Sequence, residues 1–196
     1  MPYCIKFQLI TFSKYSYGPG PHRVQFDILE NDEIVSFIVE LAGLELMPHS
    51  VHYFIKMVER KVWDNTIFQH QSNHILYAQL MDAEGNDKHD LLSEKDIPSR
   101  LSFPEYTDRH PHHKYTLGFS GRPGGPEFYI NTDNNADIHG PGGQTSHDLH
   151  EEADPCFGTV IEGRQVIDRL YERTQMITKA GNHENYTVIN SVQVLH

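Results

Sequence analysis

Alternating apolar and polar positions dominate the first part of this chain and indicate β-strands. Residues 24–29 alternate with a period of two, as a strand with one buried face does. A polar turn over residues 30–33 leads into residues 34–41, so the two segments predict a β-hairpin. Residues 3–12 alternate more loosely and could add a strand, and the Gly- and Pro-rich residues 16–21 predict a turn or linker.

Two segments have apolar positions at helical spacing instead. The first begins at Pro48, a residue suited to the first turn of a helix, and carries one apolar stripe. That stripe consists of Val51, Phe54, Ile55 and Val58. The second segment follows Gly163 and Arg164 near the end of the chain. Its inward positions are Val166, Ile167 and Leu170.

Short apolar runs predict most of the remaining strands. They cover residues 66–68, 74–81, 115–120, 127–130, 156–161 and 187–195. Residues 131–153 are rich in Gly, Asn, Asp and His, and a loop of that length in a compact domain is usually functional or mobile. Many strands with one early and one late helix predict a mainly β protein, a closed β-barrel capped at its ends.

Length and charge limit the classes of function. A chain of 196 residues fits one domain with a sizeable core, and we expect a monomer. Its net charge of −11 repels phosphate backbones, so nucleic-acid binding is not expected. The sequence has no apolar run of membrane-spanning length and no visible signal peptide. The cytoplasm is the default compartment, although a luminal domain whose leader was removed fits equally well.

The cysteines and the one glycosylation sequon leave the compartment open. Cys4 and Cys156 are too few for a disulfide framework, and they either pair across the fold or are both reduced. The sequon covers residues 185–187, and such triplets are common by chance.

Histidine is unusually frequent in this acidic chain. Protonation of many of the 14 histidines between pH 7 and 5.5 would remove much of the negative charge. His110, His112 and His113 are grouped, and the first two share a face of an extended segment. No cysteine or acidic residue stands at a metal-ligand spacing from them, so we expect neither a metal site nor another cofactor.

Five local strings, in this order, resemble the cyclophilin family. They are residues 24–28, Pro48-His49-Ser50-Val51-His52-Tyr53-Phe54, Trp63-Asp64-Asn65-Thr66-Ile67-Phe68, Gly125-Pro126-Glu127-Phe128-Tyr129-Ile130 and Phe157-Gly158-Thr159-Val160-Ile161-Glu162-Gly163. The resemblance implies a closed eight-stranded antiparallel β-barrel capped by two α-helices over residues 22–196. Residues 1–21 would be an N-terminal strand or linker extension. Between residues 69 and 111 the match is weak.

The resemblance also implies a reaction, the cis/trans isomerisation of X-Pro peptide bonds. Peptide rotation has a barrier of about 18–20 kcal/mol, and a catalyst must stabilise the twisted amide with a preorganised donor. In cyclophilins this donor is an arginine after a Phe-His pair. The proline ring lies in a pocket made of phenylalanines, a methionine, a leucine and a histidine.

The residues expected at that site depart from the family pattern. His70 falls where the arginine is expected, and an imidazole offers at most two donors against five in a guanidinium. Arg122, in a glycine-rich bend, is the other candidate for the donor. The remaining predicted groove residues are Phe68, Ile75, Leu76, Ala78, Glu127, Tyr129 and Asp154.

Three functional hypotheses follow from these departures. The first is a cyclophilin-like module that binds an extended or proline-containing peptide segment with little or no isomerase activity. The alternative is a divergent isomerase that uses His70 or Arg122 in place of the arginine. The third is a metal- or pH-responsive scaffold, which requires histidine side chains that converge within about 4 Å.

Overall fold

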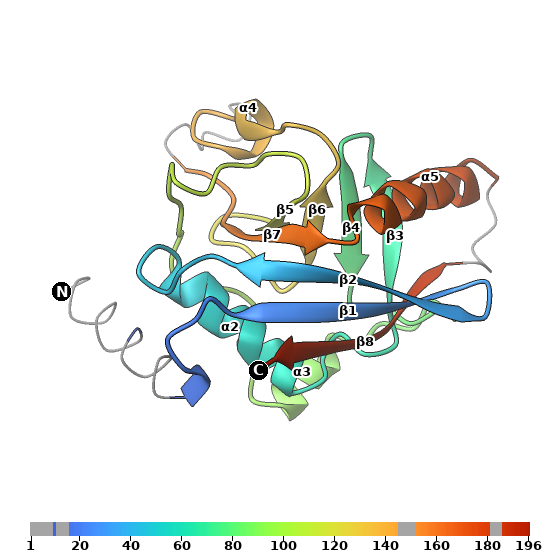
Figure 1. Cartoon of the computed structure of the whole chain (residues 1–196), viewed down its shortest axis with the longest axis horizontal. Helices are drawn as coiled ribbons and strands as arrows, with labels where there is room; N and C mark the ends of the chain where they lie inside the picture. Colours follow the sequence, from blue (N-terminus) through green and yellow to red (C-terminus); the bar gives the residue numbers. More distant parts are fainter. Residues whose placement is uncertain (1–9, 11–15, 145–151, 181–185) are drawn as a thin grey trace.

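In the computed structural model, eight antiparallel strands close into a barrel (Figure 1). The structure describes residues 10, 16–144, 152–180 and 186–196, without the side chains of residues 70, 71 and 176–180. The strands are β1 (Arg23–Glu30), β2 (Glu33–Leu41), β3 (Thr66–Ser72), β4 (Ile75–Gln79), β5 (Thr116–Phe119), β6 (Phe128–Asn131), β7 (Cys156–Glu162) and β8 (Thr187–Leu195). Around the barrel their order is β1-β2-β7-β5-β6-β4-β3-β8.

The described part of the chain contains four helices. They are α2 (Pro48–Glu59), α3 (Asp90–Glu94), α4 (Ala136–His139) and α5 (Arg164–Ala180). Figure 1 shows the two long helices, α2 and α5, on opposite sides of the barrel, as the sequence predicts for its two caps. None of the described helices combines the length and apolar character needed to cross a membrane.

Aromatic side chains fill the inside of the barrel. Phe26 of β1 and Phe37 of β2 pair across the hairpin, and their rings stack with centroids 4.7 Å apart. Phe128 of β6 lies edge-on to Phe54 of α2 at 5.5 Å and to Trp63 at 4.7 Å. All five side chains are at most 1% exposed, so this closely packed core holds the barrel strands, β4 and β6 included, in place.

Helix α2 receives its N-terminal cap from a distant residue. Met47 at the cap position makes no side-chain hydrogen bond to the helix. Instead the buried carboxylate of Glu105 accepts hydrogen bonds from the backbone N–H groups of His49 and Ser50, at 3.2 and 2.8 Å. It also accepts one from the Ser50 hydroxyl at 2.8 Å. This carboxylate satisfies helix-end donors and ties the segment around Glu105 to α2.

The structure adds local detail to the predicted elements. The two predicted helices are present, and the two further helices, α3 and α4, are only five and four residues long. Helix α4 lies within the segment 131–153 that we expected to be a loop, because a single helical turn leaves no periodic pattern. Cys156 is a free, buried thiol, and burial raises its pKa to about 12. Cys4, residues 145–151 and all of the predicted first strand at residues 3–12 except residue 10 lie outside the described residues.

Candidate functional site

Strands β4 and β6 direct alternate side chains to the inside and the outside of the barrel. In β4, Leu76 and Ala78 belong to the core, whereas Ile75 and Tyr77 point the other way. Tyr129 of β6 is the register partner of Tyr77 and forms a separate cluster with Ile75 and Tyr77. We call this set of three residues the outer cluster, and it is the floor of the candidate site.

Three predicted groove residues lie on the wrong face of the barrel. The side chains of Phe68, Leu76 and Ala78 are 0% exposed and belong to the core cluster. A peptide on the outer surface cannot contact them, so their assignment to the groove is wrong. The outer face of β4 is instead formed by Ile75, which was predicted, and Tyr77, which was not.

For Leu76 and Ala78 the error comes from an irregularity between β3 and β4. Gln69 pairs with Tyr77 and Ser72 pairs with Ile75, so β3 carries one more residue than β4 between these two pairs. Because side chains alternate between the two faces of a strand, one extra residue reverses the face expected for every residue that follows it. His70 lies in this irregular stretch, and its side chain is outside the described residues. Its role as a donor therefore stays a prediction.

Gln79 and Glu127 form one rim of the site. Continuing the register of Ala78 with Phe128 by one residue places Gln79 opposite Glu127. Among the described residues, the buried Oε1 atom of Gln79 has no hydrogen-bond partner, so the rim presents an acceptor to which none of them donates. The carboxylate of Glu127 is 14% exposed and lies 2.6 Å from Nε2 of His89. Burial lowers the pKa of His89, but its bonds to Asp87 and Glu127 outweigh burial and raise it.

Tyr129 is enclosed from both sides of its ring. A Cβ atom added to Gly118 of β5 would lie 2.7 Å from the ring, so only glycine fits beneath it. His139 lies over the ring with centroids 4.6 Å apart. The hydroxyl donates to Oδ2 of Asp154 at 2.9 Å. Burial, and then the Asp154 charge, raise the pKa of Tyr129 well above its ordinary value, so the hydroxyl stays a donor.

Asp154 is the centre of a buried polar network. Its Oδ1 accepts from Nε of Arg122 at 2.9 Å, and its Oδ2 accepts from Tyr129 and from Nδ1 of His139 at 2.8 Å. The side chains of Arg122 and Asp154 are 1% and 4% exposed. Burial raises the pKa of Asp154, but hydrogen bonds from His139 and Arg122 outweigh it and lower the pKa. The carboxylate is therefore ionised and fully paired.

The guanidinium of Arg122 is committed to this network. Besides Asp154, it donates to the backbone carbonyls of Gly143 at 3.3 Å, Glu152 at 2.6 Å and His139 at 3.4 Å. A guanidinium that holds three backbone carbonyls and a carboxylate acts as a structural clamp. The predicted use of Arg122 as a donor to substrate would require it to leave these partners.

The grouped histidines do not converge. His110 contacts the Cys156 thiol and the Thr159 hydroxyl, whereas His112 donates to the carbonyl of Asp154 at 2.9 Å. His113 is exposed. Within the residues that the structure describes, no three His, Cys, Asp or Glu side chains could hold a metal ion. The convergence occurs elsewhere, between His74 and His139.

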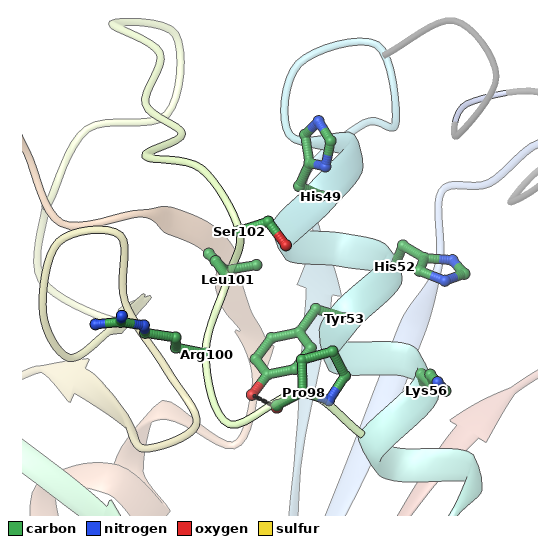
Figure 2. Close-up of a pocket in the computed structure, with 8 residues that line it drawn as sticks. All are labelled: His49, His52, Tyr53, Lys56, Pro98, Arg100, Leu101 and Ser102. Atoms are coloured by element: carbon green, nitrogen blue, oxygen red, sulfur yellow. Dashed lines mark hydrogen bonds between the residues drawn. The ribbon is translucent and has the colours of Figure 1, made fainter. Parts of the chain in front are cut away.

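A hollow of about 170 Å³ lies between α2 and residues 98–102 (Figure 2). Tyr53 crosses it, and its hydroxyl donates to the Pro98 carbonyl at 2.7 Å. Four of its lining residues are cationic or titrate to a cation, namely His49, His52, Lys56 and Arg100. In Figure 2, Arg100 extends away from α2, whereas His52 and Lys56 are carried by α2 itself. These charges do not meet around one ligand position, so the hollow carries no functional assignment.

Solved structures that resemble this chain include cyclophilins. A cyclophilin-type peptidyl-prolyl cis-trans isomerase from Cryptosporidium parvum matches with a TM-score of 0.58 and 12% identity, over 89% of this chain and 98% of that chain. The same protein in the presence of the dipeptide Ala-Pro matches with a TM-score of 0.54 and 13% identity, over 89% and 99%. A cyclophilin from Hirschia baltica gives 0.52 and 13%, over 89% and 74%. At this identity the likeness shows the fold alone.

The family follows from a second comparison. The barrel and its two capping helices define the cyclophilin fold. The family described as "Cyclophilin type peptidyl-prolyl cis-trans isomerase/CLD" matches residues 26–194. The chain therefore belongs to the cyclophilin-type peptidyl-prolyl cis-trans isomerase family, as the five strings predict. No curated protein sequence matches it.

Proposed function

We propose that this domain binds an extended peptide segment over β4 and β6 and has little or no prolyl isomerase activity. The observation that carries the proposal is the burial of Tyr129 and Asp154 and the hydrogen bond between them. By resemblance, these two residues stand where the family has a pocket phenylalanine and the pocket histidine. Here they are 1% and 3% exposed and bonded to each other, so the position expected for a proline ring is filled by the protein itself.

The electrostatic requirement of the reaction supports the same conclusion. Isomerisation needs a donor near the proline nitrogen, and losing one preorganised donor typically costs about 10²–10³ in rate. Arg122 has the donors, but its guanidinium is buried against Asp154 and three backbone carbonyls. The buried Tyr129 hydroxyl donates to Asp154 in the same way.

Peptide binding needs less than catalysis does. An extended segment requires a floor, a rim and backbone partners, and this surface offers the outer cluster and the Oε1 acceptor of Gln79. Because Oε1 is buried, the Gln79 side chain would have to turn outward for a peptide N–H group to satisfy that acceptor. Because Glu127 borders the same rim, a segment that is uncharged or basic fits better than an acidic one.

The proposal is tested by one protein preparation in two assays. A coupled assay with a panel of X-Pro peptides at pH 7.5 should show no acceleration above the uncatalysed rate. Uncatalysed isomerisation takes tens of seconds or longer. Titration of isotope-labelled protein with the same peptides should shift the backbone amide signals of Tyr77, Gln79 and Glu127. Gln79→Leu should weaken binding, because it removes the acceptor and keeps the apolar bulk.

Two results would contradict this function. Turnover that disappears in His70→Ala would establish the alternative, a divergent isomerase with an imidazole donor. Absence of amide shifts with every peptide in the panel would show that the surface is not a peptide groove. Lys61→Ala, in the exposed turn after α2, is the matched control and should leave binding unchanged.

A further inference from the structure

A continuous chain of hydrogen bonds runs from the surface to the buried Asp154. The Ser72 hydroxyl lies 2.6 Å from Nδ1 of His74. Nε2 of His74 lies 3.1 Å from Nε2 of His139, and Nδ1 of His139 lies 2.8 Å from Oδ2 of Asp154. This is the histidine convergence that the third sequence hypothesis required.

The chain fixes where each proton lies at neutral pH. The ionised carboxylate of Asp154 only accepts, so Nδ1 of His139 carries a proton and its Nε2 carries a lone pair. That lone pair can accept only if Nε2 of His74 carries a proton. Nδ1 of His74 is then the acceptor for the Ser72 hydroxyl. Every member has one role, and the lowered pKa of His74 keeps its imidazole neutral.

This geometry limits how many protons the pair can hold. One proton, and only one, fits between the two facing Nε2 atoms, and Nδ1 of His139 must keep its own for Asp154. A first added proton can go only to Nδ1 of His74, which then gives up the hydrogen bond that it accepts from the Ser72 hydroxyl. A second added proton would set two N–H groups against each other at 3.1 Å between two cations.

We propose that His74 and His139 form an acid-operated latch on the peptide site. The inference rests on the proposed function and adds its regulation. At neutral pH, His74 holds the His139 ring over Tyr129 and the proline position is closed. In mild acid the part-exposed His74 ring separates from His139, and the space above Tyr129 opens to a proline ring.

The charged groups around the pair do not stabilise two cations in the closed state. The titratable and charged groups that face it, with their elements, are Arg122 before β6, Tyr129 on β6, Asp133 after β6, His112 before β5 and Asp154 before β7. Asp154 is already balanced by Arg122. Asp133 favours a cation on His74, but it cannot neutralise a second one on His139.

The direction of the pH effect follows from the difference between the closed and open states. Burial, and then the neighbouring His139, lower the pKa of His74 in the closed state, although Asp133 opposes them. In the open state the ring is hydrated and has its ordinary pKa near 6.5. The closed state is thus fully favoured above pH 6.5 and loses its advantage as the pH falls through the lowered pKa.

The test compares two peptides that differ only at proline. Acetyl-Ala-Ala-Pro-Phe-amide and acetyl-Ala-Ala-Ala-Phe-amide are titrated at pH 7.5 and 5.5. One linked proton changes an equilibrium at most tenfold per pH unit, and the effect begins only below pH 6.5. We therefore expect the affinity for the proline peptide, divided by the affinity for the alanine peptide, to be about tenfold higher at pH 5.5 than at pH 7.5. His74→Gln keeps a donor to Nε2 of His139 but does not titrate, and it should abolish the rise. His113→Ala, an exposed histidine, should retain it.

A second readout is independent of any peptide. Long-range nitrogen–proton NMR at pH 7.5 should show a proton on Nδ1 of His139 and on Nε2 of His74. The opposite tautomers, or an affinity ratio that does not change between pH 7.5 and 5.5, would overturn the latch. Binding of neither peptide at either pH would instead contradict the proposed function, so the two failures are distinguishable.

Discussion

Replacing Arg122 by Met should destabilise the folded domain by about 3–5 kcal/mol. The substitution leaves the Asp154 carboxylate buried at 4% exposure without its cation, and removing one partner of a buried ion pair has a cost of this size. It also leaves the carbonyls of Gly143 and Glu152 without a donor. The free energy of unfolding, measured by urea titration at pH 7.5, is the quantity to compare.

An exposed ion pair in the same molecule supplies the control for Arg122. Arg23 and Glu40 pair across the β1–β2 hairpin at 3.0 Å, with side chains 50% and 36% exposed. Arg23→Met should change stability by less than about 1 kcal/mol, because water screens such a pair. If Arg122→Met has an equally small effect, the buried network is not the clamp described above.

Replacing Gly118 by Ala should destabilise the domain by about 1–3 kcal/mol and displace Tyr129. The added Cβ would lie 2.7 Å from both Cζ and the hydroxyl oxygen of Tyr129, a separation at which one of the two must move. Overpacking of a filled site has this cost. Movement of the ring would also lengthen its hydrogen bond to Asp154, so a changed chemical environment of His139 in NMR spectra is expected.

Two comparisons make the Gly118 result specific. Gly43→Ala is the matched control, since its Cβ would meet only Oε2 of Glu45 at 3.5 Å. The double variant Gly118→Ala with Tyr129→Ala removes the ring that the methyl group meets. The two substitutions should therefore be non-additive, with the Gly118→Ala cost largely absent in the Tyr129→Ala background. Additive effects would show that the cost comes from somewhere other than this contact.

The sequence predicts the regular elements well because each carries its own local signal. The β1–β2 hairpin and the starts of α2 and α5 agree with the structure to within a residue or two, and β8 coincides with the predicted residues 187–195. A period of two, a proline at a helix start and an apolar stripe are all readable from neighbouring residues. The short helices α3 and α4 have no such pattern.

The site was harder to predict, for two physical reasons. A single extra residue between Gln69 and Ser72 inverted the faces of Leu76 and Ala78, although the alternation within β4 would place Tyr77 outside once the register is known. The partners of the polar network are also distant in sequence: Arg122 and Asp154 are 32 residues apart, and His74 and His139 are 65 apart. The sequence around one residue of such a pair carries no pattern that identifies the other residue.

The capping of α2 by Glu105 sets an order of events during synthesis of the chain. Ser50 leaves the ribosome 55 residues before the carboxylate that satisfies its N–H group and hydroxyl. At about 5–20 residues per second this corresponds to roughly 3–11 s in which the first turn of α2 has only water for its donors. Chaperones that recognise exposed apolar segments would have that interval to bind the stripe of Val51, Phe54 and Ile55, which is fully buried in the finished domain.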